Sequence, residues 1–473
     1  MGLLNHAGAQ LTARPEDAEI LVVNTCSFID TAKQESVDAI LEMARHKTQG
    51  RARKLIVAGC LVERYRDEIQ KNIPEVDAVI GTGELDAILA AAGLAPAAPS
   101  PFNILSGNSA AGVRPGQESQ AGTHKARPEG DHRERAGRFS RDQWQGAAHL
   151  LPTYLYDEST PRLLTTPRAS AYIKIAEGCD HPCSFCVIPN LRGKFRSRRL
   201  ESVVAEAEAL VARGVREITL IGQDTTCYGE DLGLKDGLAS LLDRLAQIPK
   251  LRWLRFLYAY PNRVTAKLLE TIAKHPNICR YLDLPLQHAS PDVLKRMKRG
   301  AGAEIFLKTL EKVRNTVPGI ALRTSFIVGF PGESPRDVLV LEEFIKEARF
   351  DWLGVFNYSH EEGSAAFALS GQVPKRSIEA RRKRLMKLQQ AISHKAKQEW
   401  VGREMTLLAE GPSQETDLLW EARTEFHAPE IDGKVYINDF GPLEMLEPGR
   451  FYRARITEAH DYDLVARILG PEP

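Results

Sequence analysis

The sequence lacks an excess of charge of either sign. Lys and Arg total 63 and Asp and Glu total 62, so the formal net charge of the 473-residue chain is +1. A protein that coats nucleic acid through bulk charge needs a large positive excess, so this class of protein is excluded for the chain as a whole. Local charged patches remain open, because a balanced total does not say where the charges lie.

Long apolar runs are missing as well. No run approaches the roughly 20 apolar residues that a membrane-spanning helix needs. Residues 1–12 show no basic segment followed by an apolar stretch, which a secretory signal would have. We therefore expect a cytoplasmic protein with no membrane partner. In that compartment the seven cysteines are expected to be metal ligands, reactive thiols or packed side chains rather than disulfides.

Residues 1–95 have the pattern of a small parallel α/β domain. Apolar runs at 20–23, 55–58 and 76–80 have the length and the β-branched content of strands, and a helical spacing of apolar residues covers 31–45. A strand–helix–strand order predicts a parallel sheet. The chain opens in a helical segment, Gly2-Leu3-Leu4, with no strand before it.

A stretch without periodicity separates this domain from the next. Residues 96–150 are dominated by Pro, Gly, Ser, Ala, Arg and Glu, which predicts a largely disordered linker or insertion, with a structured hairpin as the alternative. Six strand-then-helix units then follow up to residue 400 and predict a partial α/β barrel. Its expected strands are 172–176, 217–221, 253–257, 280–284, 322–328 and 352–356.

The end of the chain has a different pattern. From residue 402 the helical spacing stops, and short alternating segments separated by turn residues appear at 405–409, 434–437, 451–457 and 463–468. Several short strands in this arrangement predict a small all-β barrel. The fold class is therefore α/β with a C-terminal β barrel.

Cys179, Cys183 and Cys186 form a C-x3-C-x2-C sequence directly after the first expected barrel strand. Three cysteines in eight residues are too crowded for disulfides with one another, and three thiolates suit a soft metal centre. The carboxyl end of a barrel strand is also where such folds hold their chemistry. Zinc is the alternative, but only His181 lies near as a fourth ligand. Three protein ligands would leave one iron of a 4Fe–4S cluster open for a substrate.

The cysteine spacing, with Phe185 before the last cysteine, resembles the signature of the radical S-adenosylmethionine (SAM) enzymes. Segments 172–179 and 188–198 are similar to the methylthiotransferase branch of that family, and so are five shorter strings. These are Val23-Asn24-Thr25-Cys26, Ala58-Gly59-Cys60, Gly222-Gln223-Asp224-Thr225-Thr226, Pro285-Leu286-Gln287-His288-Ala289-Ser290 and Gly329-Phe330-Pro331-Gly332-Glu333. The resemblance covers nearly the whole chain except 96–150. It implies a methylthiotransferase N-terminal domain at 1–95, a linker at 96–165, a radical-SAM barrel of six βα units at 166–400 and a TRAM barrel at 401–470.

The resemblance also implies the cofactors. A 4Fe–4S cluster would be held by Cys179, Cys183 and Cys186 and would bind SAM at its open iron. Electron transfer into the sulfonium of SAM would yield a deoxyadenosyl radical, which abstracts hydrogen from an unactivated carbon. An electron donor and a sulfur source are implied as partners.

Four further residues are candidates for contacts to SAM. Gln223 and Asp224 follow the second barrel strand and are expected either to contact SAM or to cap a helix. Gly329 and Gly332 follow the fifth strand and are expected either to let the backbone approach the adenine closely or to form a turn.

A run of basic residues lies beside the cysteine loop. We expect it to pair with the SAM carboxylate or with an acidic side chain of the substrate, or else to form a solvated strand edge. Its members are Arg192, Lys194, Arg196, Arg198 and Arg199.

Cys26 and Cys60 each follow an expected strand of the N-terminal sheet. In an open α/β sheet those strand ends face one crevice, so the two cysteines indicate a second metal site or two packed thiols. The resemblance implies a second 4Fe–4S cluster with three cysteine ligands, the first of which lies upstream of the segment that matches Met1. We therefore expect the sequence to begin at an internal Met. Cys227 and Cys279 do not match the third position and are expected to be packing or surface thiols.

The substrate has two candidates, because one branch of the family modifies tRNA and another modifies protein. Residues 402–469 hold fourteen acidic and seven basic side chains, a net charge of −7. Such a surface would repel RNA and attract a basic protein, unless it is only an ordinary solvated surface. The expected activity is SAM-dependent methylthiolation of the β-carbon of an aspartate in small-subunit ribosomal protein twelve, with no specific tRNA binding. The alternatives are a tRNA adenosine methylthiotransferase, and an iron–sulfur protein that only cleaves SAM or has no catalytic activity.

Overall fold

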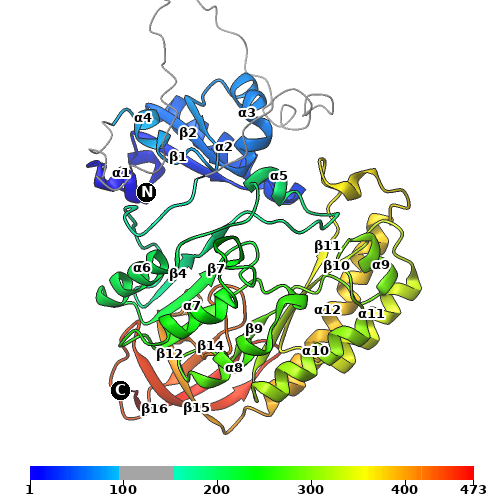
Figure 1. The fold of residues 1–473 in the computed structure, drawn as a ribbon. Coiled ribbons are helices and arrows are strands. Elements are labelled where there is room, and N and C mark those ends of the chain that lie inside the picture. Colours follow the sequence, from blue (N-terminus) through cyan, green and yellow to red (C-terminus); the bar gives the residue numbers. More distant parts are fainter. Residues whose placement is uncertain (95–153, 417, 473) are drawn as a thin grey trace, which may run out of the picture. The chain divides into compact units, whose positions relative to one another are not determined.

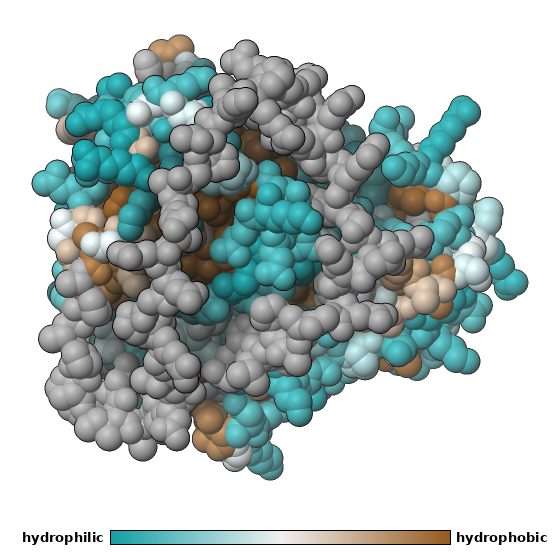
Figure 2. Space-filling view, turned by 90° about the horizontal axis from the view of Figure 1, so that it is seen from above, coloured by the Kyte–Doolittle hydropathy of each residue, from teal (hydrophilic) through white to brown (hydrophobic). Residues whose placement is uncertain are grey.

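The computed structural model describes residues 1–94, 154–416 and 418–472. These residues divide into two compact units, one formed by residues 1–27 with 31–94 and the other by residues 28–30 with the described residues from 154 onward. The predicted linker over 96–150 lies outside the described residues. In the view of Figure 2, hydrophilic residues make up most of the visible described surface, with hydrophobic residues showing between them. Among the described helices, none joins the length with the apolar character that crossing a membrane would require.

The first unit is a three-stranded parallel sheet with the strand order β1-β2-β3 and helices on both faces (Figure 1). Leu55 and Val57 of the middle strand pack against α2 and α3, while Ile56 packs against α1 and α4. All three are fully buried, as expected for a parallel strand covered on both sides. The elements are α1 (Gly2–His6), η1 (Pro15–Asp17), β1 (Ile20–Thr25), α2 (Asp30–Gln49), β2 (Lys54–Gly59), α3 (Cys60–Asn72), β3 (Ala78–Ile80) and α4 (Ala87–Ala92).

The second unit contains a partial barrel of six parallel strands. They form two three-stranded sheets, β4-β7-β8 and β9-β10-β11, and a single bridge between Leu254 and Ile278 links β8 to β9. The structure thus confirms the predicted partial barrel, with each expected strand present to within a few residues. The strands are β4 (Ser170–Lys174), β7 (Glu217–Ile221), β8 (Trp253–Phe256), β9 (Tyr281–Asp283), β10 (Ala321–Val328) and β11 (Trp352–Asn357).

Helices cover the outer face of this barrel and a short hairpin lies at its carboxyl end (Figure 1). The hairpin pairs β5 (Ala176–Glu177) with β6 (Arg196–Ser197) and encloses the predicted cysteine loop. The helices are α5 (Ile188–Arg192), α6 (Leu200–Ala212), α7 (Gly237–Leu245), α8 (Ala266–Lys274), α9 (Pro291–Arg296), α10 (Ala303–Thr316), α11 (Pro335–Ala348) and α12 (Lys375–Gln398), with short 3-10 turns η3 (Glu230–Leu232), η4 (Pro261–Arg263) and η5 (Ala365–Ala368).

The C-terminal residues form a closed five-stranded barrel, which confirms the predicted β barrel. The strand order is β12-β13-β14-β16-β15. Sequence reasoning missed β13, because the strand has only four residues and two of them, Glu421 and Arg423, are charged. The strands are β12 (Glu404–Pro412), β13 (Trp420–Arg423), β14 (Val435–Asp439), β15 (Phe451–Ala459) and β16 (Leu464–Pro471).

A buried ionic network joins the two barrels of the second unit. Glu217, the first residue of β7, accepts hydrogen bonds from Arg423 of β13 (2.7 Å), from Arg255 of β8 (3.1 Å) and from the Ser170 hydroxyl (2.7 Å). Burial alone would raise the pKa of Glu217, but the two guanidinium groups outweigh it and lower the pKa to about 2. The amino ends of the partial-barrel strands therefore contact the β barrel. Their carboxyl ends remain accessible for a catalytic site.

Candidate functional site

The three cysteines of the C-x3-C-x2-C sequence lie on one loop between β5 and α5. Gly178 opens the loop with φ +80°, and a Cβ there would lie 2.2 Å from the Lys194 carbonyl oxygen, so only glycine fits. The Cys179 amide donates to the Gly193 carbonyl (3.3 Å), and the Cys186 amide donates to the Cys183 carbonyl (3.1 Å). The loop is thus a tight turn that places three thiols at the carboxyl end of the first barrel strand.

The thiols of this loop are partly or largely removed from water. Burial raises the pKa of Cys179 to about 11 and the pKa of Cys186 to about 12. At neutral pH these side chains would stay protonated unless a cation stabilised their thiolates. Three thiols on one loop, together with a need for bound positive charge, fit a 4Fe–4S cluster with three protein ligands.

Asp224 lies in the loop after β7 and is committed to contacts within the protein. Its Oδ2 atom lies 2.5 Å from His181 Nε2 and accepts from the Cys227 thiol (3.0 Å), and its Oδ1 atom accepts from the Thr226 amide (2.8 Å). The neighbouring Gln223 has a buried Oε1 atom for which the described residues offer no hydrogen-bond partner. The contact of these two residues to SAM stays a prediction.

His181, Asp224 and Cys227 form a cluster that sequence reasoning missed. One ligand-type atom of each lies within 4.8 Å of the others. Cys227, expected to be a packing thiol, is indeed buried, but it bonds to a carboxylate rather than to apolar neighbours. The only signal in the sequence was that His181 lies inside the cysteine motif and that Cys227 follows Asp224 by three residues.

The two glycines predicted to approach the adenine both have left-handed backbones. Gly329 has φ +81°, and a Cβ there would lie 2.4 Å from Ile378 of α12, so the glycine permits a close approach of that helix. Gly332 has φ +77° and its amide donates to the Gly371 carbonyl (2.8 Å). Their role toward SAM stays a prediction.

The basic run beside the loop differs in part from its prediction. Arg198 is buried and donates to Glu206 (2.5 Å), and Arg192 donates to Glu177 (2.7 Å). These ion pairs neutralise both guanidinium groups within the protein. Neither pairing with SAM or substrate nor a solvated strand edge, the roles expected for the run, holds at Arg198, because its buried guanidinium bonds to Glu206 and Ser202 of α6.

Cys26 and Cys60 are brought together by strand register in the first unit. Thr25 and Gly59, the last residues of β1 and β2, pair with each other, so the two cysteines follow equivalent positions on neighbouring parallel strands. Cys26 is exposed, and Cys60 is buried at the start of α3. The structure thus places these cysteines side by side at the carboxyl edge of the sheet, whereas Cys279 lies in the second unit. The metal role of the pair stays a prediction.

Hydroxyl groups hold the backbone of both cysteines. The Cys26 amide donates to the Ser36 hydroxyl (3.0 Å), and the Ser27 hydroxyl donates to the Cys60 carbonyl (3.1 Å). Arg64 is buried nearby and donates to the Ser27 carbonyl (2.9 Å). These contacts fix the backbones of the two cysteines at the carboxyl edge of the sheet.

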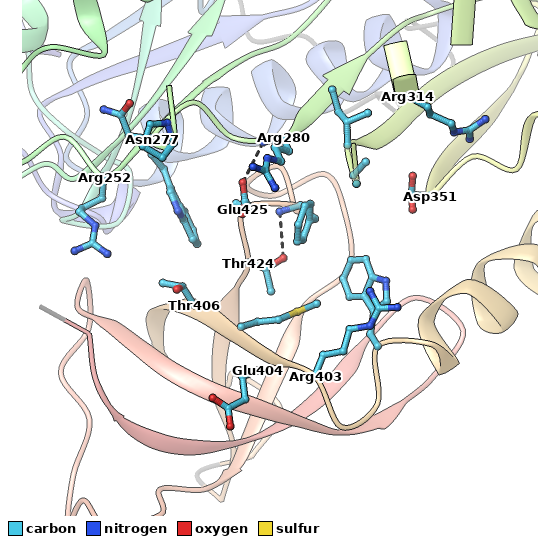
Figure 3. A pocket seen from close by; sticks show the side chains of 18 of the residues that line it. Arg252, Asn277, Arg280, Arg314, Asp351, Arg403, Glu404, Thr406, Thr424 and Glu425 are labelled. Atoms are coloured by element: carbon cyan, nitrogen blue, oxygen red, sulfur yellow. Dashed lines mark hydrogen bonds between the residues drawn. The ribbon is translucent and has the colours of Figure 1, made fainter. Parts of the chain in front are cut away.

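A cleft of about 1130 Å³ lies between the amino ends of the partial barrel and the β barrel (Figure 3). Its lining includes Trp253 and Ala321, the first residues of β8 and β10, and Met405 of β12. The Arg280 amide donates to Glu425 (3.1 Å) across it. Because the cleft is at the opposite strand ends from the cysteine loop, it does not contribute to the candidate site.

Three family models match the chain. The Radical SAM superfamily model matches residues 173–345, the model of uncharacterized protein family UPF0004 matches residues 1–81, and the TRAM domain model matches residues 401–469. These matches confirm the expected radical-SAM and TRAM folds, and SAM and iron–sulfur clusters as the cofactors that go with the first of them.

Several curated relatives are similar over almost their full length. A ribosomal protein uS12 methylthiotransferase RimO from Koribacter versatilis (strain Ellin345) is 67% identical over 472 residues, which cover 99% of this chain and 92% of the relative. Proteins of the same name from Solibacter usitatus (strain Ellin6076) and Trichlorobacter lovleyi are 54% and 43% identical; the alignments cover 100% and 99% of this chain and 91% and 94% of those proteins. The chain therefore belongs to the RimO family of radical-SAM methylthiotransferases.

Proposed function

We propose that this chain methylthiolates the β-carbon of an aspartate in ribosomal protein uS12, the small-subunit protein twelve. The observation that carries the proposal is the 67% identity over nearly the whole chain with a uS12 methylthiotransferase. In the reaction a C–H bond of the acceptor carbon is replaced by a C–S bond, and the hydrogen leaves in deoxyadenosine. Two molecules of SAM are consumed: one gives its methyl group and leaves as S-adenosylhomocysteine, and the other is cleaved by an electron from an external reductant into methionine and the deoxyadenosyl radical that takes the hydrogen. An inorganic sulfide or persulfide donor supplies the sulfur.

The cysteine loop is the proposed SAM-cleaving site. Cys179, Cys183 and Cys186 would hold a 4Fe–4S cluster, which supplies the reducing power for radical chemistry when it is bound together with SAM. The loop itself orients the three ligands through its hydrogen bonds to the Gly193 and Cys183 carbonyls. The partial burial of Cys186, which raises the pKa of its thiol, would help to keep water from the reactants.

Cys26 and Cys60 are proposed as ligands of a second cluster, and Gln223, Asp224, Gly329 and Gly332 as part of the SAM pocket. Support for the second cluster is the shared strand edge, which brings the two cysteines to neighbouring positions, and the exposure of Cys26. Support for a polar SAM contact is clearest at Gln223, whose buried Oε1 atom has no hydrogen-bond partner in the described part of the chain. Asp224 would contribute to the SAM pocket indirectly, by holding the ring of His181, a residue of the cysteine loop.

The proposed domain boundaries are 1–95, 96–165, 166–400 and 401–470. The family matches at 1–81, 173–345 and 401–469 fall within three of these ranges. Within the predicted linker, Tyr156 accepts from the Lys174 amide (3.1 Å) and Arg162 pairs with Glu206 (2.5 Å), so its last residues pack on the barrel. We place the reaction in the cytoplasm, where ribosomal proteins are made.

The acidic TRAM barrel is proposed to dock the basic substrate. Glu430 and Glu444 are exposed and form no ion pair within the described residues, which makes them candidates for this surface. Asp432, one of the acids counted in the net charge, is unsuitable because it is buried. It accepts from the Tyr281 hydroxyl (2.7 Å) and lies 3.4 Å from Arg323.

The experiment is a competition between the two candidate substrates. Anaerobically reconstituted protein is incubated with SAM, dithionite and sulfide in the presence of equal amounts of uS12 and bulk tRNA. We expect methylthio groups on uS12 alone, located on one aspartate by peptide mapping. The same reaction at 1 M salt should be slower, because the Debye length falls from ~10 Å at 0.1 M to ~3 Å. Methylthioadenosine in the tRNA and unmodified uS12 would overturn the proposal in favour of the tRNA enzyme.

A matched pair of variants tests the docking surface. Glu430→Lys with Glu444→Lys should weaken uS12 binding at low salt and flatten its salt dependence. Glu270→Lys with Glu311→Lys makes the same charge change at two exposed acids of α8 and α10, outside the TRAM barrel, and should leave binding within about twofold of the wild type. Equal effects of the two pairs would mean that only the total charge matters.

A further inference from the structure

Arg299 lies against the cysteine loop and has no part in the assignments above. Its Nη1 atom is 3.7 Å from the Cys183 Sγ atom. Hydrogen bonds and charge at a ligand sulfur are among the factors that set the reduction potential of an iron–sulfur cluster. The position of this guanidinium therefore bears on how readily a cluster on the loop accepts an electron.

The guanidinium of Arg299 is held on three sides. Its Nη2 atom donates to the Pro285 carbonyl (2.5 Å), and its central carbon lies 4.2 Å from the centroid of the Tyr260 ring. The third contact is the one to Cys183. A planar fork that bonds on one edge and stacks on an aromatic face keeps few alternative rotamers, so the charge has a fixed place.

The backbone turn that carries Arg299 is also fixed. It follows α9, and both neighbours of the Arg299–Gly300 pair, Lys298 (φ +55°) and Ala301 (φ +72°), have left-handed backbones that are uncommon for residues with a side chain. The Arg299 amide donates to the Leu294 carbonyl (2.9 Å), which closes the end of the helix. The turn therefore holds two residues in a backbone conformation that they do not favour on their own. In this conformation the Arg299 side chain reaches the cysteine loop.

The cysteine loop is fastened to this same turn. Ser184, next to Cys183, donates from its amide to the Met297 carbonyl (3.0 Å) and from its hydroxyl to the Arg296 carbonyl (2.8 Å). On the other side, the His181 ring stacks on the Tyr260 ring with a centroid distance of 3.8 Å. The cysteine loop and the Arg299 guanidinium are therefore held by the same two elements, the turn after α9 and the Tyr260 ring.

We propose that Arg299 is a positioning residue that raises the reduction potential of the cluster held by Cys183 and its two companion cysteines. The inference rests on the proposed function, because it takes those cysteines as cluster ligands. Reduction brings one electron from an external reductant into the cluster and breaks no bond in the protein. A fixed positive charge beside a ligand sulfur stabilises the reduced cluster more than the oxidised one.

The test is a redox titration of the anaerobically reconstituted full-length chain, followed by the electron paramagnetic resonance signal of the reduced cluster. Replacing Arg299 by methionine should lower the ratio of reduced to oxidised cluster at a fixed potential about tenfold, a shift of about 59 mV for one electron. Arg299→Lys keeps the charge but not the fork and should fall between the two. Lys298→Met removes the same charge from the exposed neighbour and should stay within about twofold of the wild type.

Iron content separates an effect on potential from loss of the cluster. If Arg299→Met does not retain iron, Arg299→Gln decides, because it keeps an amide donor for the Pro285 carbonyl without the charge. A wild-type potential in the variant that retains its cluster, or an equal shift in Lys298→Met, would overturn the role of Arg299. A wild-type protein without any 4Fe–4S signal would instead refute the proposed function itself.

Discussion

The triplet Cys179, Cys183 and Cys186 and the pair Cys26 and Cys60 reach their places in different ways. The triplet is local, since one loop of the partial barrel carries all three thiols. The members of the pair follow two neighbouring strands of the other unit, and they meet only because Thr25 pairs with Gly59 in the parallel register. A short motif therefore specifies the first site by itself, whereas the second depends on the sheet forming in the correct register.

The surroundings of the two cysteine sets also differ. The triplet lies among buried groups, with a raised pKa at Cys186 and a guanidinium beside Cys183. The pair includes the exposed Cys26, and the groups that hold it are hydroxyls bonded to its backbone. A closed site suits the handling of a radical, and an open one suits exchange of sulfur with a donor in solution.

The largest expected effect is at the triplet. Cys183→Ala should reduce deoxyadenosine formation from SAM more than about 100-fold, because loss of a ligand exceeds the 10–100-fold cost typical of an outer contact. Liquid chromatography of an anaerobic reaction with SAM and dithionite measures the product. Cys279→Ala, a buried thiol outside both sets, is the control. Near wild-type deoxyadenosine from Cys183→Ala would refute the assignment.

The corresponding change at the pair should separate SAM cleavage from sulfur insertion. Cys26→Ala leaves the barrel loop intact, so deoxyadenosine formation should stay within about threefold of the wild type. Methylthio product on uS12 should fall more than about tenfold, because the second metal site would lose a ligand. Both products are measured in the same vessel. Unchanged methylthiolation would make Cys26 an ordinary exposed thiol and remove the functional contrast.

A stability prediction contrasts the two units that carry these sites. Glu217→Gln leaves Arg255 buried without its anion and leaves Arg423 with Glu410 as its remaining carboxylate, and should cost about 3–5 kcal/mol in the second unit only. Hydrogen exchange followed by mass spectrometry should show faster exchange in β4, β7 and β13 and no change in β1 and β2. Equal changes in both units would mean that the chain unfolds as one cooperative body.

The same carboxylate gives a pH dependence. The pKa of Glu217 is lowered from its ordinary value of 4.5 to about 2 in the folded chain. A carboxyl group with a depressed pKa stabilises the folded state fully above pH 4.5 and loses this contribution as the pH falls toward 2. The difference in unfolding free energy between the wild type and Glu217→Gln should therefore shrink across this acidic range. A constant difference would contradict the ionic origin.

The smallest expected effect concerns the hydroxyl that holds Cys26. Ser36→Ala removes one buried acceptor for the Cys26 amide, worth about 1 kcal/mol. Iron loss from the N-terminal site to a chelator should become about fivefold faster. Thr48→Ala removes a hydroxyl bond at the far end of α2 and serves as the control. Equal rates for the two variants would show that the Ser36 contact does not support the site.

How far the sequence predicted the fold follows from the range of the interactions involved. The barrel strands have apolar runs that are visible locally, as in 217–221 and 322–328, and the structure has β7 and β10 there. The strand β13 was missed because Arg423 finds its partner Glu217 in another part of the chain. A buried ion pair between distant residues gives no apolar pattern, so only the tertiary structure shows that Arg423 is an interior residue.

At the candidate site, too, the residues of a short motif could be predicted, whereas residues that depend on contacts with distant parts of the chain could not. The spacing of the cysteine loop predicts three ligands together, but not the turn after α9 that holds the loop and aims Arg299 at it. Asp432 was counted as a surface charge because acidic residues are usually exposed, yet it bonds to Tyr281 across the interface between the two barrels. Residues that act through distant partners thus remain hidden until the fold brings them into contact.

The central claim is that two separate sets of cysteines hold two clusters. The most direct test is the iron and acid-labile sulfide content of the reconstituted wild type, Cys183→Ala and Cys26→Ala. Two 4Fe–4S clusters predict about eight irons per chain in the wild type and about four in each variant, with the SAM-responsive signal lost only in Cys183→Ala. About four irons in the wild type, with no decrease on replacing Cys26, would contradict the account.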